Sequence, residues 1–179
     1  MRLSIKALLV FFIVLASCAP ETETTTYYLI RHAEKDRSDS LNRNPNLTEA
    51  GLKRAENWAK YFSNIELDDV YSTNYNRTIQ TAQPTAKSKN LEIKSYNPRN
   101  LFDSIFQAET KGKTVLVVGH SNTTPALANR IFAANMSVAE KPIYKNMDDR
   151  DNASLYILSF QKGGFGKKKV SAKVVKVQD

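Results

Sequence analysis

The chain has 179 residues, a single cysteine and a formal net charge of +8 at pH 7. This length indicates one domain with one core, and a lone cysteine excludes a disulfide framework within the chain. Six lysines and one acidic residue give the segment 162–179 a net charge of +5. We expect a solvated edge strand there or a contact with an anionic membrane, and no binding of nucleic acid, because the lysines do not alternate with aromatic residues.

The first residues have the pattern of an export signal. Arg2 and Lys6 are followed by an apolar stretch, 7–16, that is too short to span a membrane. Leu15-Ala16-Ser17-Cys18 resembles the lipobox of bacterial lipoproteins, which implies lipid on Cys18 after removal of residues 1–17. We therefore expect an exported bacterial lipoprotein anchored on the periplasmic or cell-surface side. The alternatives are an ordinary signal cleaved near Ala19 or an uncleaved helix.

The remaining chain divides into a flexible tether at 18–26 and one domain at 27–179. The apolar runs and turn signals predict an α/β three-layer sandwich with a mostly parallel central sheet, helices on both faces, a C-terminal hairpin and no large lid insertion. Strands are expected at 27–30, 69–72, 91–96, 114–118, 154–160 and 170–177, with the hairpin bend at 163–166. A first helix is expected from Thr48, with an inward face of Leu52, Ala55, Ala59 and Phe62. A second is expected from Arg77, with an interruption at Pro84. Two more are expected, one around Leu101, Ile105 and Ala108 and one after Ser121.

Two of these strands end in the only histidines of the chain. Arg31-His32 follows the first apolar run, and Gly119-His120 follows the run 114–118. Arg77 opens the helix after another strand. In an open α/β sheet, ligands bind at the carboxyl ends of the strands, so we expect these side chains to converge there.

Two arginines aimed at one place indicate an anionic ligand, because their forked donors match phosphate or carboxylate geometry. A neutral imidazole can attack a phosphoryl group, and a second one, if protonated, can donate to its oxygens. The residue types therefore suit phosphoryl transfer without a metal or another cofactor. A metal hydrolase using His32, Glu34 and His120 is the rival, but the sequence supplies no further firm ligand and the arginines would repel a cation.

These motifs resemble the histidine phosphatase superfamily, which includes the phosphoglycerate mutases. Arg31-His32-Ala33 is similar to its Arg-His-Gly signature, and Arg77 and Gly119-His120-Ser121 follow in the same order over 27–160. The resemblance implies that His32 is the nucleophile and that Arg31, Arg77 and His120 form the phosphate pocket, to which we add Asn122 as a substrate-binding residue. It implies an acid for the leaving group, for which Asp103 is the first choice and Glu34 the second, with substrate or water as alternatives. Ser121 stands where another branch has an aspartate, and Ala33 replaces the usual glycine.

The predicted function is a metal-independent phosphatase for phosphate monoesters with a phosphohistidine intermediate on His32. Its substrate would be a small phosphorylated molecule or a phosphorylated side chain, since short connections predict an open pocket with loop 36–46 beside it. The alternative is a catalytically weak lipoprotein of the same fold that binds phosphate esters.

Overall fold

The computed structural model describes residues 23–136, 143–162 and 168–177. Within these residues the chain forms one six-stranded sheet in the order β3-β2-β4-β1-β5-β6. The strands are β1 (Thr24–Arg31), β2 (Asp69–Ser72), β3 (Ile93–Ser95), β4 (Thr114–Gly119), β5 (Ser154–Lys162) and β6 (Lys168–Lys176). Strands β3, β2, β4 and β1 are parallel, whereas β5 and β6 are antiparallel to their neighbours.

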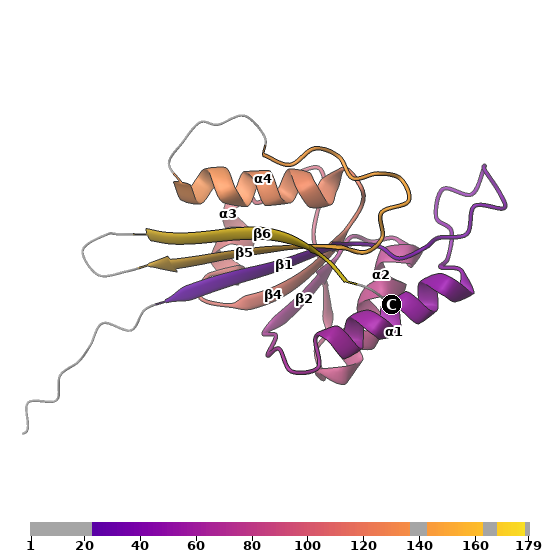
Figure 1. Cartoon of the computed structure of the whole chain (residues 1–179), viewed down its shortest axis with the longest axis horizontal. Coiled ribbons are helices and arrows are strands. Elements are labelled where there is room, and N and C mark those ends of the chain that lie inside the picture. The colour runs from indigo at the N-terminus through magenta and orange to yellow at the C-terminus, as the bar shows by residue number, and fades with distance from the viewer. Residues whose placement is uncertain (1–22, 137–142, 163–167, 178–179) are drawn as a thin grey trace, which may run out of the picture.

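Helices cover both faces of this sheet (Figure 1). They are α1 (Glu49–Tyr61), α2 (Asn76–Ser88), α3 (Ser104–Thr110) and α4 (Thr123–Met136). One core layer packs Trp58 of α1 and Ala82 of α2 against the sheet, and the opposite layer packs Phe106 of α3 and Leu127 of α4 against it. The predicted three-layer α/β sandwich is confirmed, and no large insertion interrupts it within the described residues.

Helix α1 lies close to the chain segment that leaves β1. Thr48 caps the helix by accepting a hydrogen bond from the Gly51 amide at 3.1 Å, as expected. A Cβ on Gly51 would lie 2.2 Å from the Glu34 carbonyl oxygen, so only glycine permits this approach. The inward face of α1 includes Ala55 and Trp58, whereas Leu52, expected to point inward, is 49% exposed.

Two further boundaries and one helix face differ from the expectation. β1 begins at Thr24, where pairing with Gln161 of β5 orders residues assigned to the tether. Helix α2 continues through Pro84 to Ser88, because its buried face lies on both sides of the proline. In α3 the inward residue is Phe106, and Ile105 is 68% exposed. The predicted hairpin bend lies outside the described residues, although β5 and β6 do pair as a hairpin.

The sheet register brings the functional strand ends together. Arg31, the last residue of β1, pairs with Gly119, the last residue of β4, and Ser72 of β2 pairs with Val118. The amino end of antiparallel β5 lies at the same edge, since Leu155 pairs with Ile30. Lysine-rich β6 is an edge strand, in agreement with one of the two expectations for this segment. None of the helices among the described residues is long and apolar enough to cross a membrane.

Candidate active site

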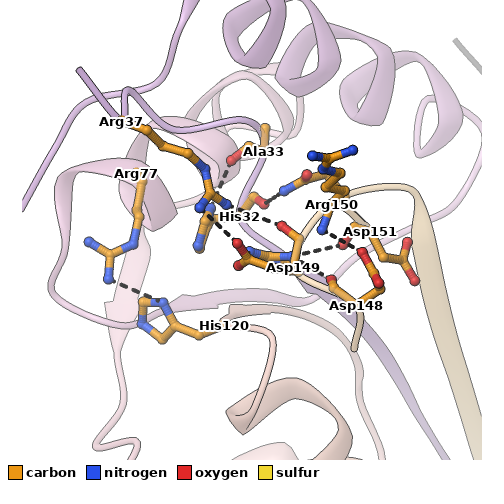
Figure 2. Close-up of polar contacts among 11 residues, drawn as sticks. His32, Ala33, Arg37, Arg77, His120, Asp148, Asp149, Arg150 and Asp151 are labelled. Carbon is orange, nitrogen blue, oxygen red and sulfur yellow. Dashed lines mark hydrogen bonds and ion pairs between the residues drawn. The ribbon is translucent and has the colours of Figure 1, made fainter. Parts of the chain in front are cut away.

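The two histidines lie side by side at this edge. Their ring centroids are 5.5 Å apart, with the planes inclined at 67°. Figure 2 shows His32 between Arg77 and the turn that carries Asp149, with His120 beside Arg77. Residues far apart in the sequence therefore meet at the carboxyl ends of β1 and β4.

Backbone and side-chain contacts fix the orientation of His32. Its Nδ1 lies 2.7 Å from the carbonyl oxygen of Ala33, and its amide donates to the Gly119 carbonyl at 3.0 Å. Because a carbonyl can only accept, Nδ1 carries the proton and Nε2 keeps its lone pair. Burial lowers the pKa of His32 to about 3, and the charges of Arg31 and Arg77 lower it further, against the opposing effect of the Ala33 hydrogen bond. At neutral pH the ring is an uncharged imidazole.

His120 has the opposite tautomer. Arg77 donates to its Nδ1 at 3.5 Å, so Nε2 carries the proton and donates to Oγ1 of Thr73 at 2.9 Å. Thr73 in turn donates to Thr78 Oγ1 at 3.0 Å, which leaves its oxygen free to accept. Burial, and then the charges of Arg77 and Arg31, lower the pKa of His120 to about 4. In this state His120 is therefore neutral, and the donor role expected for a protonated ring requires an anion that raises its pKa.

Arg77 is held at the start of α2 with its charge toward the histidines. Its guanidinium carbon lies 4.4 Å from the centroid of the Tyr75 ring, and NH1 donates to the Arg43 carbonyl at 3.3 Å. Burial lowers its pKa. Its Nε is buried without a hydrogen-bond partner among the described residues, so the guanidinium retains donor capacity.

Arg31 is 2% exposed and is held by a turn just before β5. NH1 donates to the carbonyls of Asp148 at 2.9 Å and Asp151 at 3.3 Å, and NH2 pairs with Asp149 Oδ1 at 3.2 Å. The other Asp149 oxygen pairs with Arg37 at 2.8 Å. The Arg37 hydrogen bond, and then the charges of Arg37 and Arg31, lower the pKa of Asp149. This carboxylate is therefore ionised at neutral pH.

Sequence reasoning missed the turn 148–152 as part of the site. Asn152, 7% exposed, donates from Nδ2 to the His32 carbonyl at 2.7 Å. The only sequence signal was a charged turn before a strand, which gives no information on the partner strand. Thr73, which orients His120, was also missed, since a threonine in a turn has no distinctive spacing.

A cleft of about 430 Å³ contains these groups. Its lining residues are Arg31, His32, Lys35, Tyr75, Arg77, Pro98, Arg99, His120, Ser121, Asn122, Thr123 and Asp149. Five of the predicted site residues are thus brought together: Arg31, His32, Arg77, His120 and Asn122. The lining combines imidazoles with an excess of cations, an arrangement suited to a phosphoryl group.

The segment that carries two of these arginines and the first histidine has a recognisable family pattern. Residues 27–97 match the model of the histidine phosphatase superfamily (branch 1). The segment 27–97 is therefore similar to the histidine phosphatase superfamily. A comparison with curated proteins found no match.

Several solved structures resemble this chain along most of its length. SixA from Agrobacterium tumefaciens, a candidate phosphohistidine phosphatase, is 22% identical with a TM-score of 0.59, covering 86% of this chain and 99% of its own. Mycobacterial glucosyl-3-phosphoglycerate phosphatase in complex with VO3 is 15% identical with a TM-score of 0.62, covering 86% and 100%. Phosphoglycerate mutase from Bacillus anthracis is 16% identical with a TM-score of 0.54, covering 85% and 93%. At these identities the likeness concerns the fold.

The two carboxylates predicted as acids lie outside the cleft lining. Asp103 caps α3, where Oδ1 accepts from the Phe106 amide at 2.8 Å and Oδ2 accepts from Asn100 at 3.0 Å. Glu34 Oε1 pairs with Arg54 at 2.7 Å and lines a neighbouring pocket that includes His32. The position of Asp103 therefore does not support the role of first-choice acid, because its oxygens are engaged in a helix cap.

Further predictions concern metal binding and lipidation. The described residues contain no group of three or more histidines, cysteines, aspartates and glutamates that could hold a metal ion. The rival set of His32, Glu34 and His120 is thus not assembled as a metal centre. Cys18 and the rest of the predicted signal and anchor lie outside the described residues.

Proposed function

We propose that this protein is a metal-independent phosphatase that hydrolyses phosphate monoesters through a phosphohistidine intermediate on His32. The observation that carries the proposal is the hydrogen bond from Nδ1 of His32 to the Ala33 carbonyl, 2.7 Å long, in a ring that is neutral at pH 7. It leaves the lone pair of Nε2 as the nucleophile, within a cleft that also contains Arg31 and Arg77.

In the first step, Nε2 of His32 forms a bond to phosphorus while the bond from phosphorus to the leaving oxygen breaks. The leaving oxygen takes a proton from water. Arg31 and Arg77 neutralise the phosphoryl oxygens, and the bound dianion favours protonation of His120. The phosphorylated ring is cationic, and the Ala33 carbonyl stabilises its Nδ1 proton.

In the second step, water attacks phosphorus and the electrons of the N–P bond return to Nε2 of His32. The proton of water passes to solvent, inorganic phosphate leaves, and the ring regains its starting tautomer. Short connections support hydrolysis over a mutase reaction, since only residues 73–75 join β2 to α2 and residues 96–103 join β3 to α3. Without a lid, water reaches the intermediate.

The leaving group must need little help from an acid. Asp149 is the only carboxylate among the described residues that line the cleft, and its low pKa makes it a poor proton donor. Phosphorylated imidazole side chains and aryl phosphates release such leaving groups. The name of SixA as a candidate phosphohistidine phosphatase supports phosphorylated histidine side chains as a further substrate class, in which the leaving atom is an imidazole nitrogen in place of the ester oxygen.

The lack of a proton-donating carboxylate among the described residues of the cleft lining favours a second candidate, a lipoprotein that binds phosphate esters with weak turnover. Anchoring through Cys18 belongs to both proposals. Cys18 lies six Cα-to-Cα steps before the start of β1, a reach of about 22 Å at most. β1 begins at the sheet edge opposite the cleft, so an anchored protein would present the cleft away from the membrane.

Release of an aryl alcohol from phenyl phosphate tests the function. Wild-type protein should turn over the ester with and without a chelator, and a matched His32→Ala variant should not. Activity lost to the chelator and restored by a divalent ion would contradict metal independence. Phosphate binding without release above the His32→Ala control would establish the binding lipoprotein.

A further inference from the structure

The cleft holds two cations for which the reaction above has no use. Lys35 and Arg99 line it together with His32 and Arg77. Neither has an ion-pair partner among the described residues, and the lining carboxylate, Asp149, already pairs with Arg31 and Arg37. Unpaired cations converging on one cleft repel one another unless an anion binds between them.

The charge of the cleft exceeds that of one phosphoryl group. Its lining has four cations and one carboxylate, while both histidines are neutral, which leaves three positive charges. A phosphate monoester dianion neutralises two of them. One positive charge is left over, and Lys35 and Arg99 are separate from Arg31 and Arg77, the two arginines assigned to the scissile phosphoryl group.

Lys35 and Arg99 approach from two different loops with fixed backbones. Lys35 forms an isolated β-bridge with Leu47, and the neighbouring Asp36 amide donates to the Asn46 carbonyl at 2.8 Å. The Arg99 amide donates to Asn97 Oδ1 at 2.9 Å in the loop between β3 and α3. The backbones are thus held while the cationic ends stay available. Burial, and then repulsion by Arg77, lower the pKa of Lys35, as expected for a cation without a partner.

We propose that Lys35 and Arg99 form a second anion subsite, and that preferred substrates carry a further anionic group, a carboxylate or a second phosphate, beside the scissile phosphoryl group. This inference rests on the proposed phosphatase function and specifies its substrate class. A neutral phosphate ester would fill only the part of the cleft around His32.

Matched aryl phosphates test the subsite. The ratio of kcat/KM between 3-carboxyphenyl phosphate and its methyl ester isolates the added charge, and 1,3-phenylene bisphosphate replaces the carboxylate by phosphate. At low salt, wild-type protein should prefer one of the charged substrates by about 10-fold or more, and the preference should shrink as salt rises. A Lys35→Met/Arg99→Gln double variant should bring the ratio close to one. The control Lys53→Met/Arg130→Gln, exposed positions on α1 and α4, should keep the wild-type ratio.

The outcomes separate this inference from the phosphatase proposal. Turnover of the methyl ester with a ratio near one for both charged substrates would overturn the subsite and leave the phosphatase intact. No turnover of any ester would overturn the phosphatase, and calorimetric affinities of the His32→Ala protein for the same esters would then decide the subsite. Equal affinities for charged and neutral esters would reject it, and tighter binding of a charged ester that depends on Lys35 and Arg99 would support it.

Discussion

Asn152 donates a hydrogen bond of 2.7 Å from Nδ2 to the backbone carbonyl of His32, across 120 positions of sequence. The turn that carries Asn152 also holds the Arg31 guanidinium through two backbone carbonyls. One turn thus positions both residues of the Arg-His pair. The nucleophile is placed from the side of β5 as well as from its own strand.

Asn152→Ala should slow turnover and weaken the fold. The His32 carbonyl would lose its partner in a buried site, which lowers the free energy of unfolding by about 1–3 kcal/mol. Loss of this support should reduce kcat about 10-fold or more. Steady-state kinetics and urea denaturation measure both effects. Asn100→Ala removes an exposed hydrogen bond outside the cleft and should change neither by a comparable amount; equal effects would show that the His32 contact has no special role.

Thr73→Val should impair catalysis by releasing His120. Valine keeps the shape of this fully buried residue but cannot accept the Nε2 proton, so the ring loses its fixed tautomer. We expect kcat/KM to fall about 10-fold or more, and Thr73→Ser to recover most of it. The acid limb of the pH profile should move in the Thr73→Val protein and stay in place in the Thr73→Ser protein. Failure of serine to rescue activity would show that packing of the threonine methyl group, and not its hydroxyl, is what matters.

Arg77→Ala should reduce kcat by more than about 10-fold with the fold intact. The guanidinium lies over the Tyr75 ring and donates to His120, so its removal takes away charge and orientation together. Kinetics with an aryl phosphate and a circular dichroism spectrum give the two readouts. Arg130→Ala, an exposed position on α4, is the matched control. Unchanged kinetics in the Arg77 variant would place this residue outside the reaction.

Stability should fall on acidification, and His32 should account for part of the loss. An unfolded histidine titrates near 6.5, whereas burial lowers the pKa of His32 to about 3 in the fold. Between these values the unfolded chain binds a proton that the folded chain excludes. The free energy of unfolding is therefore highest above pH 6.5 and falls by about 1.4 kcal/mol per pH unit from this histidine as the pH drops toward 3.

Urea denaturation at pH 6.5 and pH 5 measures this slope in wild-type protein and in His32→Asn. His120, whose pKa is also lowered in the fold, and Asp149 remain in the variant, so their contributions cancel in the comparison. The variant should lose about 2 kcal/mol less over this interval. Identical slopes would mean that His32 titrates normally in the folded protein.

Sequence patterns located the strand ends of the site, because apolar runs that stop at Arg31 and Gly119 leave little choice of where each strand ends. These patterns could not predict which face of a helix packs on the core where two apolar residues both fit the helical period. Leu52 and Ile105 fit a helical period yet are exposed, since Trp58 and Phe106 fill the core in their place. Tertiary packing decided between them.

Contacts that depend on strand pairing were also beyond the sequence. Residues 148–152 reach His32 only because β5 lies antiparallel beside β1, and no local pattern names that partner. Asp103 had the right charge and the right region for an acid, but a short helix begins there and its carboxylate caps it. A single sequence does not distinguish an aspartate that caps a helix from one that acts as a catalytic acid.

The most direct test of the central claim is the chemical identity of the phosphorylated residue. Rapid acid-free quenching of wild-type protein with an aryl phosphate, followed by peptide mapping, should place an acid-labile phosphoryl group on Nε2 of His32, absent from His32→Ala. A phosphoryl group on another residue, or turnover at wild-type rate in His32→Ala, would contradict the account.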